Sequence, residues 1–355
     1  MYLFFAEALK SFHSTLSNAF KTRNIQNGKA SNMKKFALIA CLLVLCSLQI
    51  KDTVTAEEKP VRIGYLQSDI HQLACWVAME KGFYEKNGAN AKVAGIFKAG
   101  PEEMSAFAAG ALDMGYVGEA PATTAVANRV AKATVMAQVN TEGSAIMVKK
   151  GSAIKKPADL EGKTVAIPGH STVQDFLLQK ALYKFKVDPK KVSIIVLKPP
   201  EMIGALKTDQ IDAFIAWEPY PAKARTMGVG QVLLTSNQIW KNHPCCVLIA
   251  DDKFRKLQPG EVRNMVKAHV EATDFINQSP DEAVKIGMKY TGMDEETVRT
   301  AMKNVNYTYD LSIDGETEYV DFLSRLKYID VPNAETFVNR FIDPSVLENV
   351  IGKQQ

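Results

Sequence analysis

Short apolar segments with the composition of β-strands alternate with helical segments along this chain, and this alternation limits its fold more than any other feature. One series begins at Val61 and a second near Lys163. Strands that alternate with helices form largely parallel sheets with helices on their faces. The sequence therefore predicts an α/β protein whose last part, 259–350, is almost entirely helical. The predicted strands are 61–65, 91–97, 112–117, 134–139, 164–167, 192–197, 213–216, 231–234 and 246–250. The predicted helices between them are 70–86, 101–109, 121–129, 172–185, 201–208 and 219–227.

The two series contain a matching turn. In the first series Asp113 opens an apolar strand and Glu119 closes it. In the second series Asp212 and Glu218 hold the same places, each 99 residues further along the chain. A proline follows both glutamates within two residues. This match predicts two similar lobes that place equivalent turns at one shared cleft.

The first 56 residues have the features of a leader. Two lysines precede an apolar run, 36–48, that is too short to span a bilayer, and small residues follow at the positions that signal peptidase requires. We expect a signal peptide over 33–56, with translation starting at Met33 and cleavage after Ala56. The leucine before Cys46 is bulky for a lipid-attachment site, so a lipid anchor is the less favoured outcome. The predicted location is the periplasm or the cell surface.

Charge and motifs exclude several classes of function. The leader holds seven of the 43 Lys and Arg residues and two of the 39 Asp and Glu residues, which leaves 36 basic and 37 acidic groups in the remainder. The chain after the leader is therefore almost neutral, and this charge gives no reason to expect nucleic-acid binding. The sequence has no nucleophile elbow, phosphate-binding loop or dinucleotide fingerprint, so we expect neither an enzyme nor a cofactor.

Three cysteines follow the leader, Cys75, Cys245 and Cys246. This odd number leaves at least one of them without a partner in the chain. Vicinal cysteines rarely bond to each other, and a bond from Cys75 to either of the others stays open. Because no spacing of Cys and His matches a zinc site, we expect no metal and interpret the cysteines as small buried side chains near a cleft.

Loops at the carboxyl ends of the strands are the expected ligand site, because open parallel sheets bind ligands there. The Ser171–Thr172 turn can cap the helix that follows, whose free N–H groups and dipole favour an anion. An ordinary cap without a ligand is the alternative. The candidate residues in these loops are Gln67, Ser68, Asp69, Gly118, Glu119, Gly169, His170, Ser171, Thr172, Trp217 and Glu218.

Acidic and aromatic residues complete the expected site. Glu119 and Glu218 facing one cleft, with Asp69 nearby, favour an amine, although such carboxylates are often only solvated. Trp217 can pack on an alkyl chain or stack on a ring. An anion at one end and an ammonium at the other outline a zwitterion. For the histidines near the cleft, hydrogen bonding is the expected role rather than general-base catalysis or metal binding.

Four segments of the chain carry a resemblance to a known family. They are Tyr65-Leu66-Gln67, Glu80-Lys81-Gly82-Phe83-Tyr84, the stretch AAGALDMG at 108–115 and the stretch LEGKTVA at 160–166. With these segments the chain resembles the nitrate/sulfonate/taurine family of ABC-transporter solute-binding proteins, which is related to the thiamine-precursor-binding proteins. The resemblance covers 61–250 and fits the helical tail more loosely.

The resemblance implies a type II periplasmic-binding-protein fold, in which two lobes with mainly parallel sheets are joined by two hinge crossings. Lobe one would comprise 57–143 and 245–355, and lobe two 144–244. Thr141 and Cys245 lie at the crossings and join the candidate ligand-binding residues. The implied protein is a monomer that works with the permease and ATPase subunits of an importer.

The implied function is delivery of a small polar solute to an ABC importer. A sulfonate such as taurine, or another amine-bearing or zwitterionic compound, is the expected solute. Glu119 stands in a loop that is often uncharged in this family, and two cysteines stand at the second crossing. Both departures count against a simple anion such as nitrate. A nitrogen heterocycle such as a thiamine-precursor pyrimidine, or an enzyme on the same fold, is the alternative.

Overall fold

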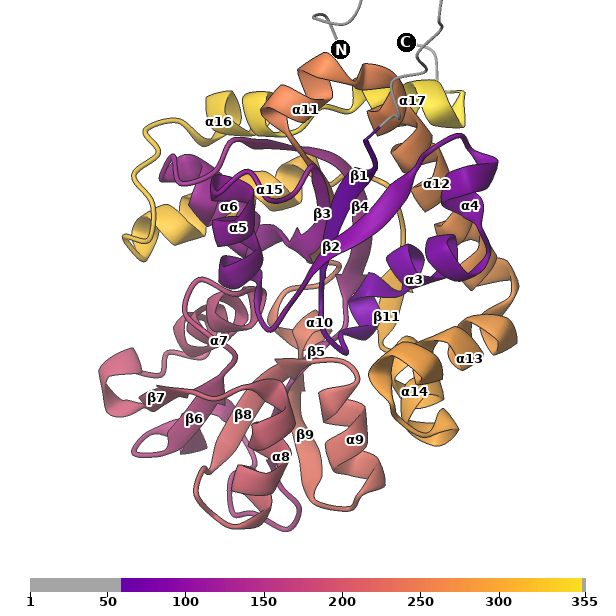
Figure 1. Ribbon diagram of the computed structural model, residues 1–355. Coiled ribbons are helices and arrows are strands. Elements are labelled where there is room, and N and C mark those ends of the chain that lie inside the picture. Colours follow the sequence, from indigo (N-terminus) through magenta and orange to yellow (C-terminus); the bar gives the residue numbers. More distant parts are fainter. Residues whose placement is uncertain (1–58, 353–355) are drawn as a thin grey trace, which may run out of the picture. The chain divides into compact units, whose positions relative to one another are not determined.

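The computed structural model describes residues 59–352. These residues form two mixed β-sheets, each flanked by helices (Figure 1). The predicted α/β class is confirmed. The predicted signal peptide, 33–56, and the preceding residues lie outside the described part. Among residues 59–352 no helix has the length and apolar character needed to cross a membrane.

The first sheet has the strand order β11-β4-β10-β3-β1-β2. Strand β1 pairs in parallel with β2 and β3, whereas β10 runs antiparallel to β3 and β4, and β11 antiparallel to β4. Its strands are β1 (Val61–Leu66), β2 (Ala91–Phe97), β3 (Met114–Gly118), β4 (Ala133–Glu142), β10 (Pro244–Asp251) and β11 (Val305–Tyr307).

The second sheet repeats this plan with the order β7-β6-β8-β5-β9. Strand β6 pairs in parallel with β7 and β8, and β5 runs antiparallel to β8 and β9. Its strands are β5 (Ser144–Lys149), β6 (Thr164–Ile167), β7 (Ser193–Val196), β8 (Ala213–Trp217) and β9 (Gly230–Thr235). The strand β5, which the sequence pattern did not predict, is a short, almost wholly buried run.

The sheets exchange one strand, and this makes them mixed rather than mainly parallel as predicted. In the first sheet β10 separates β3 from β4, and in the second β5 takes the corresponding place between β8 and β9. The chain enters β5 directly from β4 through Gly143, and it returns to β10 after the last strand of the second sheet. Each exchanged strand therefore arrives from the other sheet and lies antiparallel to both neighbours.

The repeated aspartates make equivalent hydrogen bonds in the two sheets. The Asp113 carboxylate accepts from the Arg62 backbone N–H at 2.8 Å, and the Asp113 N–H donates to the Arg62 carbonyl. Likewise, the Asp212 carboxylate accepts from the Thr164 N–H at 2.9 Å, and the Asp212 N–H donates to the Thr164 carbonyl. Each aspartate therefore ties the start of a central strand to its parallel neighbour, which supports the predicted repeat.

Helices connect the strands much as predicted. The predicted helix 70–86 is divided into η1 (Ile70–Gln72), α3 (Leu73–Glu80) and α4 (Phe83–Lys86), with Gly82 at φ 68° between the last two. The others are α5 (Gly100–Ala108), α6 (Glu119–Ala127), η2 (Pro157–Leu160), α7 (Val173–Lys184), η3 (Pro189–Lys191), α8 (Pro199–Lys207), α9 (Tyr220–Thr226) and α10 (Ser236–Ile239).

The last hundred residues are helical apart from β11, which is too short for its pattern to be recognised. Prolines begin α12 and α13, where their missing N–H costs no helical hydrogen bond. Gly292, at φ 68°, ends α13. The helices are α11 (Asp252–Leu257), α12 (Pro259–Gln278), α13 (Pro280–Thr291), α14 (Glu295–Met302), α15 (Ile313–Arg325), α16 (Ala334–Phe341) and α17 (Ser345–Ile351).

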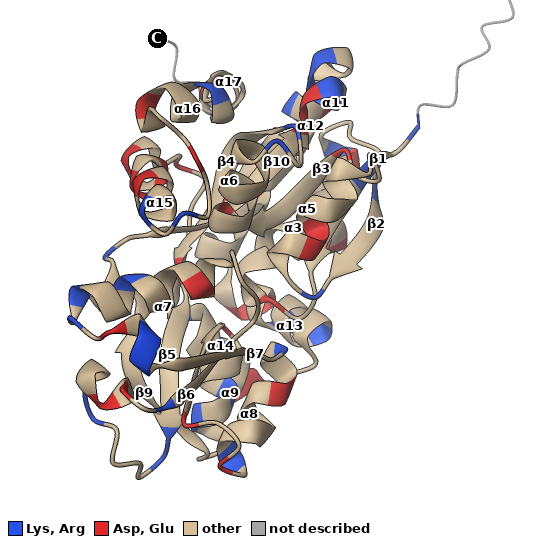
Figure 2. Cartoon of the chain, turned by 90° about the vertical axis from the view of Figure 1, so that its left-hand side faces the viewer, with Lys and Arg blue, Asp and Glu red and all other residues tan. Residues whose placement is uncertain are grey.

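Helix α3 is buried among other helices of the chain. Residues Leu73–Ala78 are all buried, and the helix packs against α12 and α13. The Trp76 ring stacks on the Tyr290 ring with centroids 5.0 Å apart. Figure 2 shows basic and acidic residues interspersed over the helices on the face in view.

Candidate ligand-binding site

A small cavity lies where loops of the two sheets meet. Its first-sheet side includes Asp69, His71, Gly118, Cys245 and Cys246, and its second-sheet side includes Thr172, Gln174 and Trp217. The free space is about 10 Å³, room for about one water molecule. A solute of several heavy atoms does not fit, so solute binding requires the two sides to separate.

Five of the predicted site residues line this cavity: Asp69, Gly118, Thr172, Trp217 and Cys245. The remaining eight do not line it. They are Gln67, Ser68, Glu119, Thr141, Gly169, His170, Ser171 and Glu218. The His170 side chain is 67% exposed, and Thr141 accepts a hydrogen bond from Asn306. Sequence reasoning missed Gln174, whereas it placed His71 and Cys246 near the cleft without selecting them as ligand-binding residues.

The start of α7 offers backbone donors to the cavity. Thr172 caps the helix, because its Oγ1 accepts from the Asp175 N–H at 3.1 Å. The Asp175 carboxylate accepts from the Ser171 N–H at 3.0 Å and so satisfies part of the helix end itself. The N–H groups of Val173 and Gln174 have no acceptor within the described part of the chain, and both residues line the cavity. These two groups are free to bind an anion.

Asp69 supplies a buried carboxyl group on the opposite side. It caps η1 by accepting from the His71 N–H at 3.1 Å, and its other oxygen accepts from Gln72 Nε2 at 2.9 Å. Burial raises the pKa of Asp69, an effect that the neighbouring His71 partly offsets. Burial, the largest single effect, lowers the pKa of His71, but the Asp69 carboxylate 3.5 Å away, the Cys246 thiol and the Gly143 carbonyl together outweigh it, and the pKa rises to about 9.

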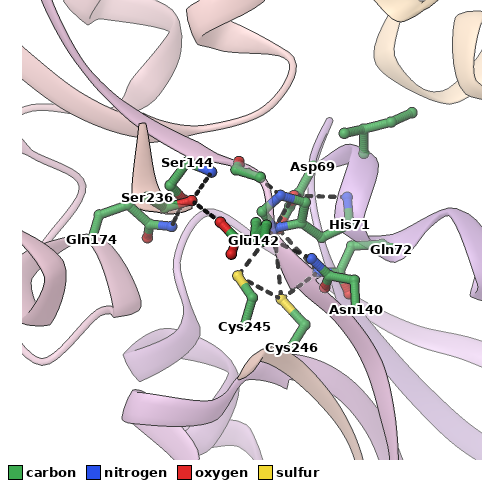
Figure 3. A network of polar contacts seen from close by, with 12 residues as sticks. Asp69, His71, Gln72, Asn140, Glu142, Ser144, Gln174, Ser236, Cys245 and Cys246 are labelled. Atoms are coloured by element: carbon green, nitrogen blue, oxygen red, sulfur yellow. Dashed lines mark hydrogen bonds and ion pairs between the residues drawn. The ribbon is translucent and has the colours of Figure 1, made fainter. Parts of the chain in front are cut away.

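The His71 ring contacts both segments through which the chain passes between the two sheets. Its Nε2 lies 2.9 Å from the Gly143 carbonyl oxygen, and its Nδ1 lies 3.4 Å and 3.8 Å from the sulfurs of Cys245 and Cys246 (Figure 3). All three cysteines of the described part are buried and free of disulfide bonds. One imidazole therefore connects the first crossing, at Gly143, to the strand that returns through the second.

A chain of hydrogen bonds joins the cavity to the first crossing. Gln174 Nε2 donates to Ser144 Oγ at 3.0 Å, and the Ser144 N–H donates to Ser236 Oγ (Figure 3). The Ser236 hydroxyl in turn donates to the Glu142 carboxylate at 3.1 Å. Helix α7 is thus tied to the residues on both sides of Gly143, where the chain passes between the sheets.

The structure does not bring Glu119 and Glu218 together. The Glu218 carboxylate accepts from the Ala222 N–H and from Asn304 Nδ2, and it lines a different cavity of about 490 Å³. Glu119 accepts from Gln138 at 3.0 Å behind the first-sheet side. Asp69 is therefore the carboxyl group that the described cavity wall presents to a ligand.

A pair of buried carboxyl groups makes the stability of the protein depend on pH. Burial raises the pKa of both Glu119 and Glu316 above their usual 4.5, and their contact raises that of Glu316 further. The folded chain therefore holds a proton that the unfolded chain releases. The free energy of unfolding should be fully present below the usual glutamate pKa and decrease as the pH rises from there through the folded-state pKa values.

Glu316→Gln should remove much of this decrease, because the amide needs no proton to stay beside Glu119 and can still accept from Thr123 Oγ1. The measurement is urea denaturation at about pH 5.5 and about pH 8. Glu335→Gln, at an exposed position, is the control and should follow the wild type. Parallel pH dependence in all three proteins would rule out this pair as the cause.

The chain matches a family model and is similar to several known proteins. The model, described as the NMT1-like family, matches residues 54–287. A Brucella abortus protein named as a binding protein is 30% identical over 295 residues, which are 80% of this chain and 90% of that protein. A Bacillus subtilis protein named for aliphatic-sulfonate binding is 29% identical over 84% of this chain and 91% of its own length. The taurine-binding periplasmic protein of Escherichia coli is 30% identical over 53% of this chain and 58% of its own length.

Solved structures show the same fold. The nitrate-binding protein of Synechocystis superposes with a TM-score of 0.75 at 16% identity, covering 84% of this chain and 90% of that one. The alkanesulfonate-binding protein of Xanthomonas axonopodis, bound to MOPS, gives a TM-score of 0.70 at 19% identity, covering 80% and 98%. This chain therefore belongs to the NMT1-like family and has the fold of the periplasmic binding proteins.

Proposed function

We propose that this protein is an extracytoplasmic solute-binding protein that delivers an amine-bearing organic anion, of the aminoalkanesulfonate class, to an ABC importer. The observation that carries the proposal is the cavity, with the Asp69 carboxyl group on one side and the free N–H groups at the start of α7 on the other. Trp217 lines the space and offers an apolar surface to a short alkyl chain. Relatives named for binding aliphatic sulfonates and taurine support this class of solute.

The charge of the cavity wall distinguishes among anions. Among the described residues that line it, none is Lys or Arg. The acidic group of the solute would therefore be held by backbone N–H groups and the helix dipole rather than by an ion pair. An ammonium group would lie beside Asp69. Nitrate has no group that could pair with that carboxylate, so a simple anion is disfavoured.

Binding would close two lobes on the solute. We divide the chain into lobe one, 57–143 and 245–355, and lobe two, 144–244, with hinges at Gly143 and at the segment before β10. The strands of the two sheets and the residues on the two sides of the cavity support this division. Closure about such hinges is the common mechanism of two-lobed receptors.

The location and the partners follow from the same function. A receptor for an importer works outside the cytoplasm, which agrees with the signal peptide predicted at 33–56. Its partners would be a permease and an ATPase, with the receptor acting as a monomer. The relatives named above are binding proteins rather than enzymes.

Calorimetric titration with matched solutes tests the proposal. Taurine should bind at least about 10-fold more tightly than ethanesulfonate, because a hydrogen bond to a charged group contributes about 1.5–3 kcal/mol. Asp69→Asn keeps the shape of the side chain but removes its charge, and should reduce this preference to about 1-fold.

One control variant and one further ligand make the result decisive. Glu201→Gln, an exposed change on α8, should keep the wild-type preference. Equal affinity of the wild type for taurine and ethanesulfonate would refute the amine site. Binding of a thiamine-precursor pyrimidine alone would favour the heterocycle alternative, and binding of none of these compounds would refute the solute class.

A further inference from the structure

Three side chains that can bind a metal ion converge beside the cavity. They are His71, Cys245 and Cys246, whose ligand atoms all lie within 4.8 Å of one another, and each residue is buried. The His71 Nδ1–sulfur distances are 3.4 Å and 3.8 Å, and the two sulfurs are 4.0 Å apart. Figure 3 shows the three groups facing one another.

These separations match those of ligands around a single ion. With Zn–S bonds of about 2.3 Å and Zn–N bonds of about 2.0–2.1 Å, tetrahedral geometry places two sulfurs about 3.8 Å apart and a nitrogen about 3.6 Å from each sulfur. The three observed distances each differ from these values by about 0.2 Å. The ligand atoms need to move very little to hold an ion.

The imidazole is oriented as it is in metal-bound histidines. The Gly143 carbonyl oxygen can only accept a hydrogen bond, so His71 Nε2 carries the hydrogen at 2.9 Å. This leaves Nδ1 as the ligand atom, on the side that faces both sulfurs. Such a second hydrogen bond to a backbone carbonyl fixes the tautomer and the ring in many metal sites.

An irregularity in β10 explains how two consecutive cysteines reach the same ion. Neighbouring side chains of a regular strand point to opposite faces of the sheet. The pairing of β10 with β4 shifts register on both sides of Cys246, however. A bulge of this kind redirects a side chain, and such features are common next to functional sites. It lets both thiol groups point toward His71.

The third cysteine of the described part provides a comparison within the same chain. Cys75 is also buried, and its sulfur contacts only the Tyr84 hydroxyl, at 3.6 Å, among the hydrogen bonds of the described residues. It belongs to no group of metal-binding side chains there. Burial of a thiol in this protein therefore does not by itself produce the arrangement around Cys245 and Cys246.

We propose that His71, Cys245 and Cys246 bind one thiophilic d¹⁰ metal ion, Zn²⁺ or Cu⁺. Thiolate and imidazole are the ligands that such ions prefer. Binding replaces the protons of the thiols and of Nδ1, and the Asp69 carboxylate, 3.5 Å from Nδ1, offsets part of the ion's charge. The three ligands also line the cavity, so an ion can reach them from the cleft. This site does not depend on the identity of the solute, because all its ligands lie on the first-sheet side.

Titration of the reduced, metal-free protein with Cd²⁺ tests the site without any solute. Cadmium bound to thiolates gives an ultraviolet charge-transfer band whose intensity reports the number of sulfur ligands. We expect one Cd²⁺ per chain with two thiolates, displaced by Zn²⁺. Cys245→Ser and Cys246→Ser should each halve the band, and His71→Gln should weaken affinity by at least about 100-fold while keeping the band at saturation.

Cys75→Ser is the matched control, and it should bind Cd²⁺ like the wild type. Thermal unfolding without metal will show whether each variant is folded. The wild-type protein alone can overturn the proposal, since Cd²⁺ bound without two thiolates per ion, or no binding under reducing conditions, contradicts it. The proposal is also contradicted if the Cys245→Ser/Cys246→Ser double variant keeps the full band, or if Cys75→Ser loses as much of the band as that double variant does.

Discussion

Replacing Gly143 by alanine should lower the free energy of unfolding by about 2–5 kcal/mol and abolish solute binding. Gly143 has φ 88°, a backbone conformation that costs an L-residue about 1–2 kcal/mol. A Cβ atom there would lie 2.2 Å from His71 Nε2 and 2.8 Å from a methyl carbon of Val305. His71 would have to move and lose its hydrogen bond to the Gly143 carbonyl, which contributes the rest of the effect.

Chemical denaturation and calorimetric titration measure the two consequences. Gly110→Ala is the matched control, because Gly110 has φ 68° and nothing lies within 4 Å of the position that a Cβ atom would take there. It should show only the backbone cost of about 1–2 kcal/mol and bind solute normally. If both variants lose the same stability and bind equally well, the clash between residue 143 and His71 affects neither the free energy of unfolding nor solute binding.

Replacing Trp217 by alanine should lower the free energy of unfolding by about 3–5 kcal/mol, the usual cost of truncating a buried tryptophan. The side chain is 3% exposed, stands at the end of β8 and packs edge-on against Tyr220 with ring centroids 6.3 Å apart. It also lines the cavity. The variant should therefore lose solute affinity as well, because the apolar wall opposite Asp69 disappears.

Denaturation in urea and solute titration at a temperature where the variant stays folded separate these effects. Leu257→Ala removes a large apolar side chain that is 66% exposed, and it should change stability by less than about 0.5 kcal/mol. A Trp217→Ala protein with wild-type stability would contradict the packing argument. One with wild-type affinity would remove Trp217 from the binding surface.

The positions of most strands could be predicted because each depends on a local pattern. An apolar run ending in a turn identifies β1, β3, β6 and β8 without knowledge of the rest of the chain. The repeated Asp113 and Asp212 also proved informative, since each makes the same backbone contacts in its own sheet. Strand β5 was missed because it follows β4 after a single residue, Gly143, and the two strands belong to different sheets.

The candidate site was predictable only in part. The rule that ligands bind at the carboxyl ends of strands selected Asp69, Thr172 and Trp217, which the structure brings to one cavity. The same rule selected Glu119 and Glu218, whose carboxylates accept hydrogen bonds from Gln138 and from Ala222 and Asn304, none of which lines the cavity. Backbone position follows from local pattern, whereas the direction of a polar side chain depends on whichever donors the fold places near it.

The sequence by itself determined the α/β class, the family and the loops from which a site could be built. Only the tertiary structure decided which of those loops share a cavity, and it alone placed His71 beside Cys245 and Cys246, 174 and 175 residues further along the chain. The physical reason is the exchange of strands between the sheets. This exchange places β10 between β3 and β4, and a bulge at Cys246 redirects its side chains. No local periodicity of the sequence encodes either this pairing of strands or the bulge.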